Sequence, residues 1–233
     1  MLPSSTVENY LKAIYSAQRA LGAATLVPMG QLASALQVVP GTATTMVKAL
    51  AESGLVEYEP YAGVRLTAAG DKLAALVLRR HRLVELFLVE VMGMSWAEVH
   101  EEAEHLEHAV SDRLIQRMDE MLGFPSVDPH GDPIPNADGG VHERAYHSLL
   151  ECPIGTRVHV ARVADQDADF LRFLEQHSLM PGQAIAVVER DPAADSVAVR
   201  GADARTVVLG ARAASKVLVD AGDLTAAPKA PAP

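Results

Sequence analysis

Apolar residues in the first part of the chain recur at the spacing of short helices and then of two short strands. In the first segment they fall on one helix face, at i, i+3, i+4, i+7 and i+8: Val7, Tyr10, Leu11, Ile14 and Tyr15. Ser5-x-x-Glu8 predicts a capping box at the start of this helix. Two more helices are predicted, over Pro28–Leu36 and Pro40–Glu52, and Gly54 is the stop signal after the latter.

Two short runs of β type follow these helices, Leu55–Tyr58 and Val64–Leu66. The residues between the runs include Pro60 and Gly63, which is typical of a hairpin connection. Helix, turn, helix and hairpin in this order predict a winged helix-turn-helix over residues 1–72. On pattern alone, a generic α+β bundle is the alternative.

The next segment has the pattern of a helical domain. A long helix, Ala68–Val91, carries apolar residues on most of its surface, so it should be buried on more than one side, as a dimer interface would explain. Ser95-x-x-Glu98 is a second capping box and predicts a helix to about His108. Ser111 caps a further predicted helix, and a loop rich in Pro and Gly follows over 126–140.

The C-terminal part has the texture of a small β-barrel, because short strand-like runs follow one another closely. The runs are Thr156–Val163, Ala184–Glu189, Val197–Arg200, Thr206–Leu209 and Ala214–Val219. A short helix is predicted between the first two, over Ala168–His177. The predicted domains are a winged helix-turn-helix (1–72), a helical dimerisation and metal domain (73–141), a linker (142–152), an SH3-like barrel (153–224) and a disordered tail (225–233).

Composition narrows the class of protein. A hydrophobic fraction of 49% supports a sizeable core, and the single cysteine, Cys152, excludes an internal disulfide and is interpreted as a core residue. The net charge of −10 argues against coating nucleic acid by bulk charge, but residues 1–72 hold five basic and five acidic side chains, which leaves room for a local reader of DNA. With no apolar stretch long enough for a bilayer and no signal-peptide core in Met1–Tyr10, we expect a cytoplasmic protein.

Histidine and glutamate residues gather at helical spacing on two successive helices. Four lie at i, i+4, i+7 and i+8, within about a 100° sector: His100, Glu104, Glu107 and His108. An apolar stripe from Val99 to Val110 runs beside them, and His81 and Glu85 form an i,i+4 pair on the preceding helix. Imidazole and carboxylate together suit divalent transition metals, so these six residues predict a metal site. Two solvated helix faces are the plainer alternative.

Other features support no further site. His105 points away from the sector, while His130, His142 and His147 lie where neither partners nor spacing indicate a ligand. A hydrolytic metal with an open position is conceivable chemistry for the same groups. The chain has no phosphate-cradling glycine loop, no H-E-x-x-H pair and no nucleophile motif, so we do not expect an enzyme.

The metal-site residues belong to longer motifs. These are His81-Arg82-Leu83-x-Glu85, Val99-His100-x-Glu102-Ala103-Glu104-x-x-Glu107-His108 and Gly131-x-Pro133-Ile134-Pro135. They resemble the iron- and manganese-dependent metalloregulators of the diphtheria toxin repressor and manganese transport regulator type, over about Thr6 to Asn136. A weaker similarity to the SH3-like domain of that family runs through Phe170-Leu171-x-Phe173-Leu174 and Leu179-Met180-Pro181-Gly182.

The resemblance implies two metal ions per subunit. His81, Glu85 and His100 would take one ion, and Glu104, Glu107 and His108 the other. A first-helix ligand would align with Asn9, where relatives carry Met or Asp, and Lys12 stands where relatives place a Glu ligand, so Glu8 is a nearby substitute. The barrel would lend Gln166 and Asp169 to the first ion.

The helix from Pro40 is the predicted recognition helix. Its exposed residues are the predicted DNA-binding residues: Pro40, Thr42, Thr44, Thr45 and Lys48. Threonine hydroxyls can bond phosphates or base edges, and a homodimer would present two such helices to a pseudo-palindromic, double-stranded operator. The alternative is that the threonines only cap and solvate the helix, and for Thr42 capping is as plausible as DNA contact.

Metal choice depends mainly on Glu104, which stands where iron-responsive relatives have a cysteine and manganese-responsive relatives a glutamate. A carboxylate is a hard oxygen donor, so we expect Mn²⁺ as the co-repressor, with Fe²⁺ as the alternative. The predicted function is a metal-dependent transcriptional repressor that controls metal-uptake and homeostasis genes. A winged-helix sensor of an organic ligand, with a structural metal site, is the runner-up.

Overall fold

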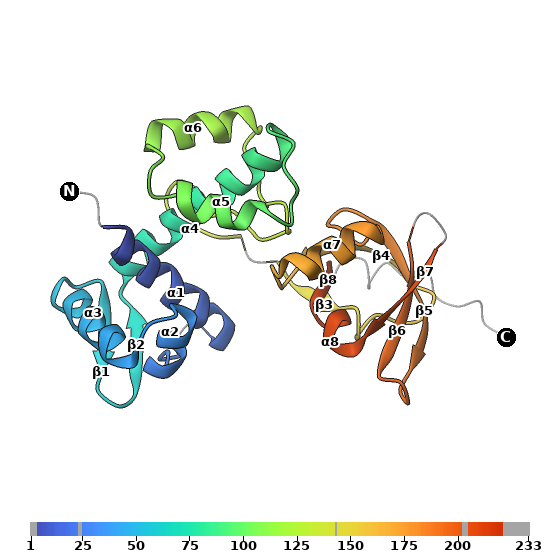
Figure 1. Ribbon diagram of the computed structural model, residues 1–233, viewed down its shortest axis with the longest axis horizontal. Helices are drawn as coiled ribbons and strands as arrows, with labels where there is room; N and C mark the ends of the chain where they lie inside the picture. The colour runs from blue at the N-terminus through green and yellow to red at the C-terminus, as the bar shows by residue number, and fades with distance from the viewer. Residues whose placement is uncertain (1–3, 23–24, 143, 202–204, 221–233) are drawn as a thin grey trace. The chain divides into compact units, whose positions relative to one another are not determined.

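The computed structural model describes residues 4–22, 25–142, 144–201 and 205–220 (Figure 1). The chain forms two compact units, one made of 1–83, 105–117 and 134–141, the other of 84–104, 118–133 and 142–233. None of the described helices combines the length and the apolar character needed to cross a membrane.

The first unit begins with a winged helix. Its elements are α1 (Ser5–Leu21), α2 (Met29–Ala35), α3 (Pro40–Glu52) and the antiparallel strands β1 (Val56–Glu59) and β2 (Gly63–Leu66). Tyr10, Leu11 and Ile14 of α1 pack in one core with Val47 of α3, as the periodicity predicts. The winged helix-turn-helix expected from the sequence is therefore present.

Two positions in this domain need comment: the start of α1, which differs from the prediction, and Gly63 in the wing, where the structure requires glycine. Ser4, not Ser5, caps α1, because its Oγ accepts from the Val7 amide at 3.4 Å; the predicted capping box is wrong, and Glu8 is left for other contacts. In the wing, Gly63 has φ +147°, and a Cβ there would lie 2.4 Å from the Val27 carbonyl oxygen. Only glycine therefore allows β2 to pair with the segment before α2.

Three helices follow: α4 (Ala68–Glu90), α5 (Val99–Leu106) and α6 (Asp112–Met121). Ser111 accepts from the Leu114 amide at 3.4 Å and so caps α6, as predicted. On α4, Val77, Leu83 and Val84 are already buried by the chain itself, so the apolar surface of this helix does not by itself require a dimer interface. Helix α5 ends earlier than predicted, which puts Glu107 and His108 in the turn after it.

Strands of the second unit form one antiparallel sheet in the order β3-β8-β4-β5-β6-β7. The strands are β3 (Tyr146–Ser148), β4 (Arg157–Val163), β5 (Ala184–Asp191), β6 (Ser196–Arg200), β7 (Thr206–Gly210) and β8 (Val217–Asp220). With α7 (Ala168–Gln176) and the short α8 (Ala211–Ala214), the sheet encloses its own apolar core, as in an SH3-like domain.

Two parts of this unit differ from what the sequence pattern predicts. Residues 142–152, predicted as a linker, contain strand β3, and Leu149 and Cys152 are fully buried beside it. Ala214 belongs to α8, so the last strand begins only at Val217. Cys152 is a core residue, as expected. The predicted tail, 225–233, lies outside the described residues.

Candidate metal centre

Two glutamates in the metal-site motifs are completely buried: Glu85 on α4 and Glu107 after α5. A carboxylate is costly to bury unless a cation or hydrogen-bond donors compensate for its lost hydration. The groups that surround each one therefore show what it does. We call the residues around the first (Glu85, His100, Asp128 and His130) the Glu85 cluster. Those around the second form the Glu107 cluster: Glu8, Asn9, Lys12, Arg80, His81, Glu107 and His108.

Imidazoles flank the carboxylate of the Glu85 cluster. Nδ1 of His100 lies 3.1 Å from Glu85 Oε1, and Nδ1 of His130 lies 3.9 Å from Glu85 Oε2. His100 is also 3.8 Å, through Nε2, from Glu104 Oε1 one turn further along α5. A neutral imidazole can present a lone pair to a metal that the same carboxylate binds.

His130, which sequence analysis set aside, is fully buried. Its Nε2 lies 2.9 Å from the carbonyl oxygen of Trp96, on whose ring it stacks with a centroid distance of 5.5 Å. Because a carbonyl only accepts, Nε2 carries the proton, and in the neutral ring Nδ1 is left as an acceptor facing Glu85. The signal in the sequence was the short Asp128-x-His130 spacing, but only the fold brings it to Glu85.

The loop that carries His130 is held firmly in place. Oδ1 of Asp128 accepts from the amides of His130 and Asp132, at 2.8 and 2.9 Å. Gly131 has φ +84°, and a Cβ there would lie 2.0 Å from the carbonyl oxygen of Ala161 on β4, so no other residue fits. The glycine of the Gly131-x-Pro133 motif is therefore needed for close packing of this loop against the sheet.

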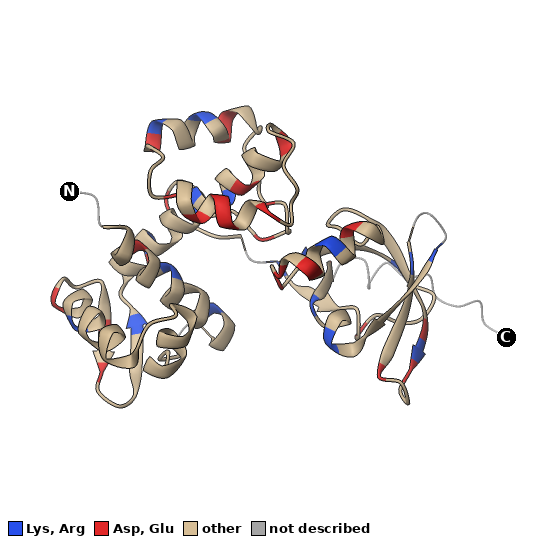
Figure 2. Ribbon diagram, in the orientation of Figure 1, with Lys and Arg blue, Asp and Glu red and all other residues tan. Residues whose placement is uncertain are grey.

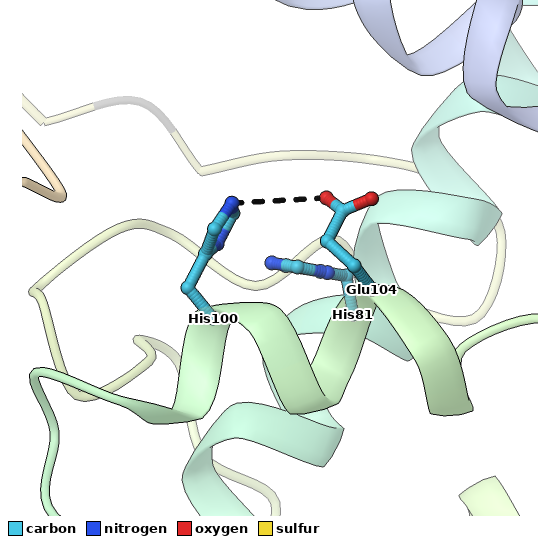
Figure 3. Close-up of side chains that lie close together, drawn as sticks. All are labelled: His81, His100 and Glu104. Atoms are coloured by element: carbon cyan, nitrogen blue, oxygen red, sulfur yellow. Dashed lines mark ion pairs between the residues drawn. The ribbon is translucent and has the colours of Figure 1, made fainter.

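Among the described residues, two sets of three side chains each bring one ligand atom within 4.8 Å of one another. One set is His81, His100 and Glu104; Figure 3 shows the imidazole of His81 reaching toward the space between the other two. The other is Glu85, Asp128 and His130. Ligands about 2.1 Å from one ion lie roughly 3–4 Å apart. Both sets are thus close to what a divalent ion requires, and their nitrogen and oxygen donors fit a transition metal.

The Glu107 cluster differs because it contains its own cations. Nζ of Lys12 donates to both carboxylate oxygens of Glu107, at 2.7 and 2.9 Å, and Nδ1 of His81 is 2.6 Å from Oε2. Burial raises the pKa of Glu107, but the hydrogen bond from His81 and the positive charge of Lys12 outweigh it and hold the pKa below its ordinary value. Glu107 is therefore a charged group that the chain itself neutralises.

His108 and Glu8 complete this cluster. Nδ1 of His108 lies 2.5 Å from Glu8 Oε2, and its Nε2 lies 2.7 Å from Asn9 Oδ1 and 3.2 Å from Glu107 Oε1. Glu8 also accepts from Nη1 of Arg80 at 3.0 Å. The first-helix residues thus lie beside His108 as the resemblance implies, but together with two basic side chains.

A second ion does not fit the Glu107 cluster as it stands. An ion bound to Glu107 would need the carboxylate oxygens that the Lys12 ammonium now holds. Neither set of three described above includes Glu107 or His108, and Glu104, expected to join them, groups with His81 and His100. In the structure Glu104 therefore groups with His81 and His100 rather than with Glu107 and His108, and Glu85 groups with Asp128 and His130.

The two ligands that the resemblance implies in the barrel, Gln166 and Asp169, lie in the second unit. Gln166 is half-buried, while the Asp169 side chain is 91% exposed and accepts from Nη2 of Arg172 at 2.7 Å. Among the described residues, Asp169 belongs to neither set of three. The side chain of His147 is 43% exposed, and its Nδ1 lies 2.9 Å from Glu151 Oε2. His105 is exposed, as expected.

The recognition helix α3 presents the residues named for DNA. Pro40, Thr42, Thr45 and Lys48 are exposed and Thr44 is half-buried. The hydroxyls of Thr44 and Thr45 donate to carbonyls one turn back, at 2.8 and 3.0 Å, so their oxygens remain acceptors. The N-cap is Val39, so the suggestion that Thr42 caps the helix is wrong. Acidic residues gather instead on α5 (Figure 2).

Comparison with known proteins agrees with this architecture. Residues 3–64 match the model of the iron-dependent repressor N-terminal DNA-binding domain, residues 67–136 its metal-binding and dimerisation domain, and residues 147–221 the FeoA domain. The iron-dependent repressor IdeR of Mycobacterium tuberculosis (strain ATCC 25618 / H37Rv) is 30% identical over 194 residues, which are 78% of this chain and 83% of that protein.

Solved structures are similar over nearly the whole chain. A manganese-dependent transcriptional repressor in complex with manganese is 42% identical, with a TM-score of 0.82, and the match covers 92% of this chain and 99% of that one. IdeR of T. acidophilum is 28% identical, with a TM-score of 0.72 over 94% and 99% of the two chains. The chain therefore belongs to the iron-dependent repressor family and is a metal-dependent transcriptional repressor, not an enzyme.

Proposed function

We propose that this repressor binds its operator in response to Mn²⁺ and that the ion binds on the Glu85 side of the metal domain. The observation that carries the proposal is a fully buried carboxylate flanked by two imidazoles. The two sets of ligand atoms found among the described residues contain further carboxylates and no cysteine. The proposed ligands are His81, Glu85, His100 and Glu104, and Asp128 and His130 offer a second set around the same Glu85. A bound divalent ion would add positive charge beside the buried carboxylate of Glu85.

The choice of Mn²⁺ rests on donor chemistry. Mn²⁺ is the weakest binder of the first-row divalent series, so a site for it needs hard oxygen donors, and Glu85 and Glu104 supply them. The manganese complex of a 42% identical repressor supports this choice, whereas the relatives named for iron keep Fe²⁺ as the alternative. A sensor of an organic ligand is the less favoured hypothesis.

DNA contact is assigned to α3. Lys48 would neutralise a phosphate, and the oxygens of Thr44 and Thr45 would accept from base or sugar groups, while Pro40 and Thr42 lie at the end of the helix that enters the groove. A homodimer would present two such helices to a pseudo-palindromic operator of metal-uptake genes. Metal and DNA then favour the same conformation, so each strengthens binding of the other.

The test is binding of the purified protein to its own promoter under anaerobic conditions, with Mn²⁺ and Fe²⁺ at matched free concentrations and a chelator control. The wild type should respond better to Mn²⁺, and Glu104→Cys should shift the preference toward Fe²⁺ because a thiolate is softer. Lys48→Ala is the matched control, because it should weaken DNA binding without changing metal affinity measured in the absence of DNA. Operator binding that ignores both metals and chelator would favour the organic-ligand sensor.

A further inference from the structure

The Glu107 cluster lies entirely within the first compact unit and is balanced in charge. Its two acids, Glu8 and Glu107, are at most 3% exposed. Two basic side chains, Lys12 and Arg80, contact them at 2.7 and 3.0 Å, and both are themselves largely buried, at 14% and 12% exposure. The two acids and the two basic side chains carry equal and opposite charges, so no external cation is needed to bury these four groups.

We propose that the ammonium of Lys12 takes the place of a second metal ion at Glu107, so that no divalent ion binds in the Glu107 cluster of the native chain. The proposal rests on the proposed function only in treating the family's metal dependence as operating through the Glu85 side. What it adds is a specificity-determining role for one lysine of the first helix.

Geometry supports the substitution. The ammonium donates to both oxygens of Glu107, which is the bidentate position an ion would take. An ammonium has three donors and no lone pair, so it cannot become a ligand when an ion arrives. A divalent ion at the same carboxylate would stand within a few ångströms of a buried positive charge, and in a poorly solvated site that repulsion is weakly screened.

The lysine also completes a connection that an ion would otherwise make. Lys12 belongs to α1 of the DNA-binding domain, and Glu107 to the segment matched by the metal-binding and dimerisation model. Glu107 in turn accepts from Nδ1 of His81, so a metal bound by this ring would be bound through Nε2. A carboxylate that orients a ligating histidine is a common support in metal sites, and here Lys12 keeps that carboxylate charged and in place.

The decisive experiment counts Mn²⁺ bound per subunit of the full-length protein by equilibrium dialysis and metal analysis. Lys12→Glu should gain one equivalent over the wild type, because it replaces the cation by an acid beside Glu107, Asn9 and His108. Adding Glu107→Gln to Lys12→Glu should remove the gained equivalent, whereas Glu107→Gln alone should leave the wild-type count unchanged. Lys72→Gln, an exposed lysine of the same unit, should also leave it unchanged.

If Lys12→Glu does not fold, bound Mn²⁺ is counted in Lys12→Gln instead. Its neutral side chain should also admit the additional ion, with weaker affinity than Lys12→Glu would give. An unchanged count in the folded variant, or a wild-type count that falls by one in Glu107→Gln, would overturn the proposal. Operator binding is measured on the same samples. A failure of every sample to respond to metal would defeat the proposed function, while the difference in counts would still decide the role of Lys12.

Discussion

Glu85 and Glu107 make an instructive pair, because both are glutamates of the metal-site motifs and both are fully buried, yet their neighbours differ. Glu107 holds a lysine ammonium on both of its oxygens. Glu85 lies between the imidazoles of His100 and His130. An ammonium neutralises a carboxylate permanently, whereas an imidazole can share it with a metal. Spacing in the sequence identifies both residues, but only the fold shows that one carboxylate is held by a lysine and the other is flanked by imidazoles.

Glu85→Gln should have the largest effect of these substitutions on metal-stimulated operator binding. The amide keeps the shape but removes the charge at the centre of the proposed site, so Mn²⁺-stimulated operator binding should fall by more than about 100-fold, beyond the 10–100-fold typical of outer-shell changes. Glu101→Gln, at an exposed position on α5, is the control and should behave as wild type in the same gel-shift titration. A Glu85→Gln variant with a normal metal response would remove the site assignment.

Glu107→Gln should act mainly on stability. It leaves Lys12 partly buried without its counter-charge, and breaking such a pair costs about 3 kcal/mol, which thermal unfolding of the metal-free protein should reveal. Mn²⁺ affinity should fall by no more than about 10-fold, because the amide oxygen can still accept from His81. If instead the metal response disappears while stability is unchanged, Glu107 is a ligand and the contrast with Glu85 is lost.

His130→Ala should have a smaller effect on Mn²⁺ affinity. It tests whether the set of Glu85, Asp128 and His130 takes part in binding the ion. We expect Mn²⁺ affinity to drop by about 10-fold in calorimetric titration, because a neighbour that supports or shares Glu85 is lost. His147→Ala, which removes a partly exposed histidine of the same unit, should leave the affinity unchanged. Equal affinities for wild type and His130→Ala would restrict the ion to His81, Glu85, His100 and Glu104.

Local elements of this chain could be predicted well from the sequence. Helix α3 has the bounds that Pro40 and Gly54 indicate, because proline and glycine act on the backbone within a turn of their own position. The i,i+4 pair His81 and Glu85 likewise needs no tertiary information. These features depend on neighbours in the chain, where spacing and structure are directly connected.

Contacts between distant segments could not be predicted in the same way. Lys12 and Glu107 are 95 residues apart, and nothing in either local pattern shows that an ammonium lies on that carboxylate. His130 sits in a loop without periodicity, and its burial depends on Gly131 packing against β4. The family resemblance marked Lys12 as a departure, but its consequence depends on a contact that only the fold creates.

The position of the bound ion tests the central claim most directly. Crystals of the full-length protein grown with saturating Mn²⁺ should give an anomalous difference peak at bonding distance from Glu85 or from its neighbours His81, His100 and Glu104. No peak should lie within bonding distance of Glu107, where Nζ of Lys12 should still contact both oxygens. A manganese peak bonded to Glu107 and His108, with Lys12 displaced, would contradict the account.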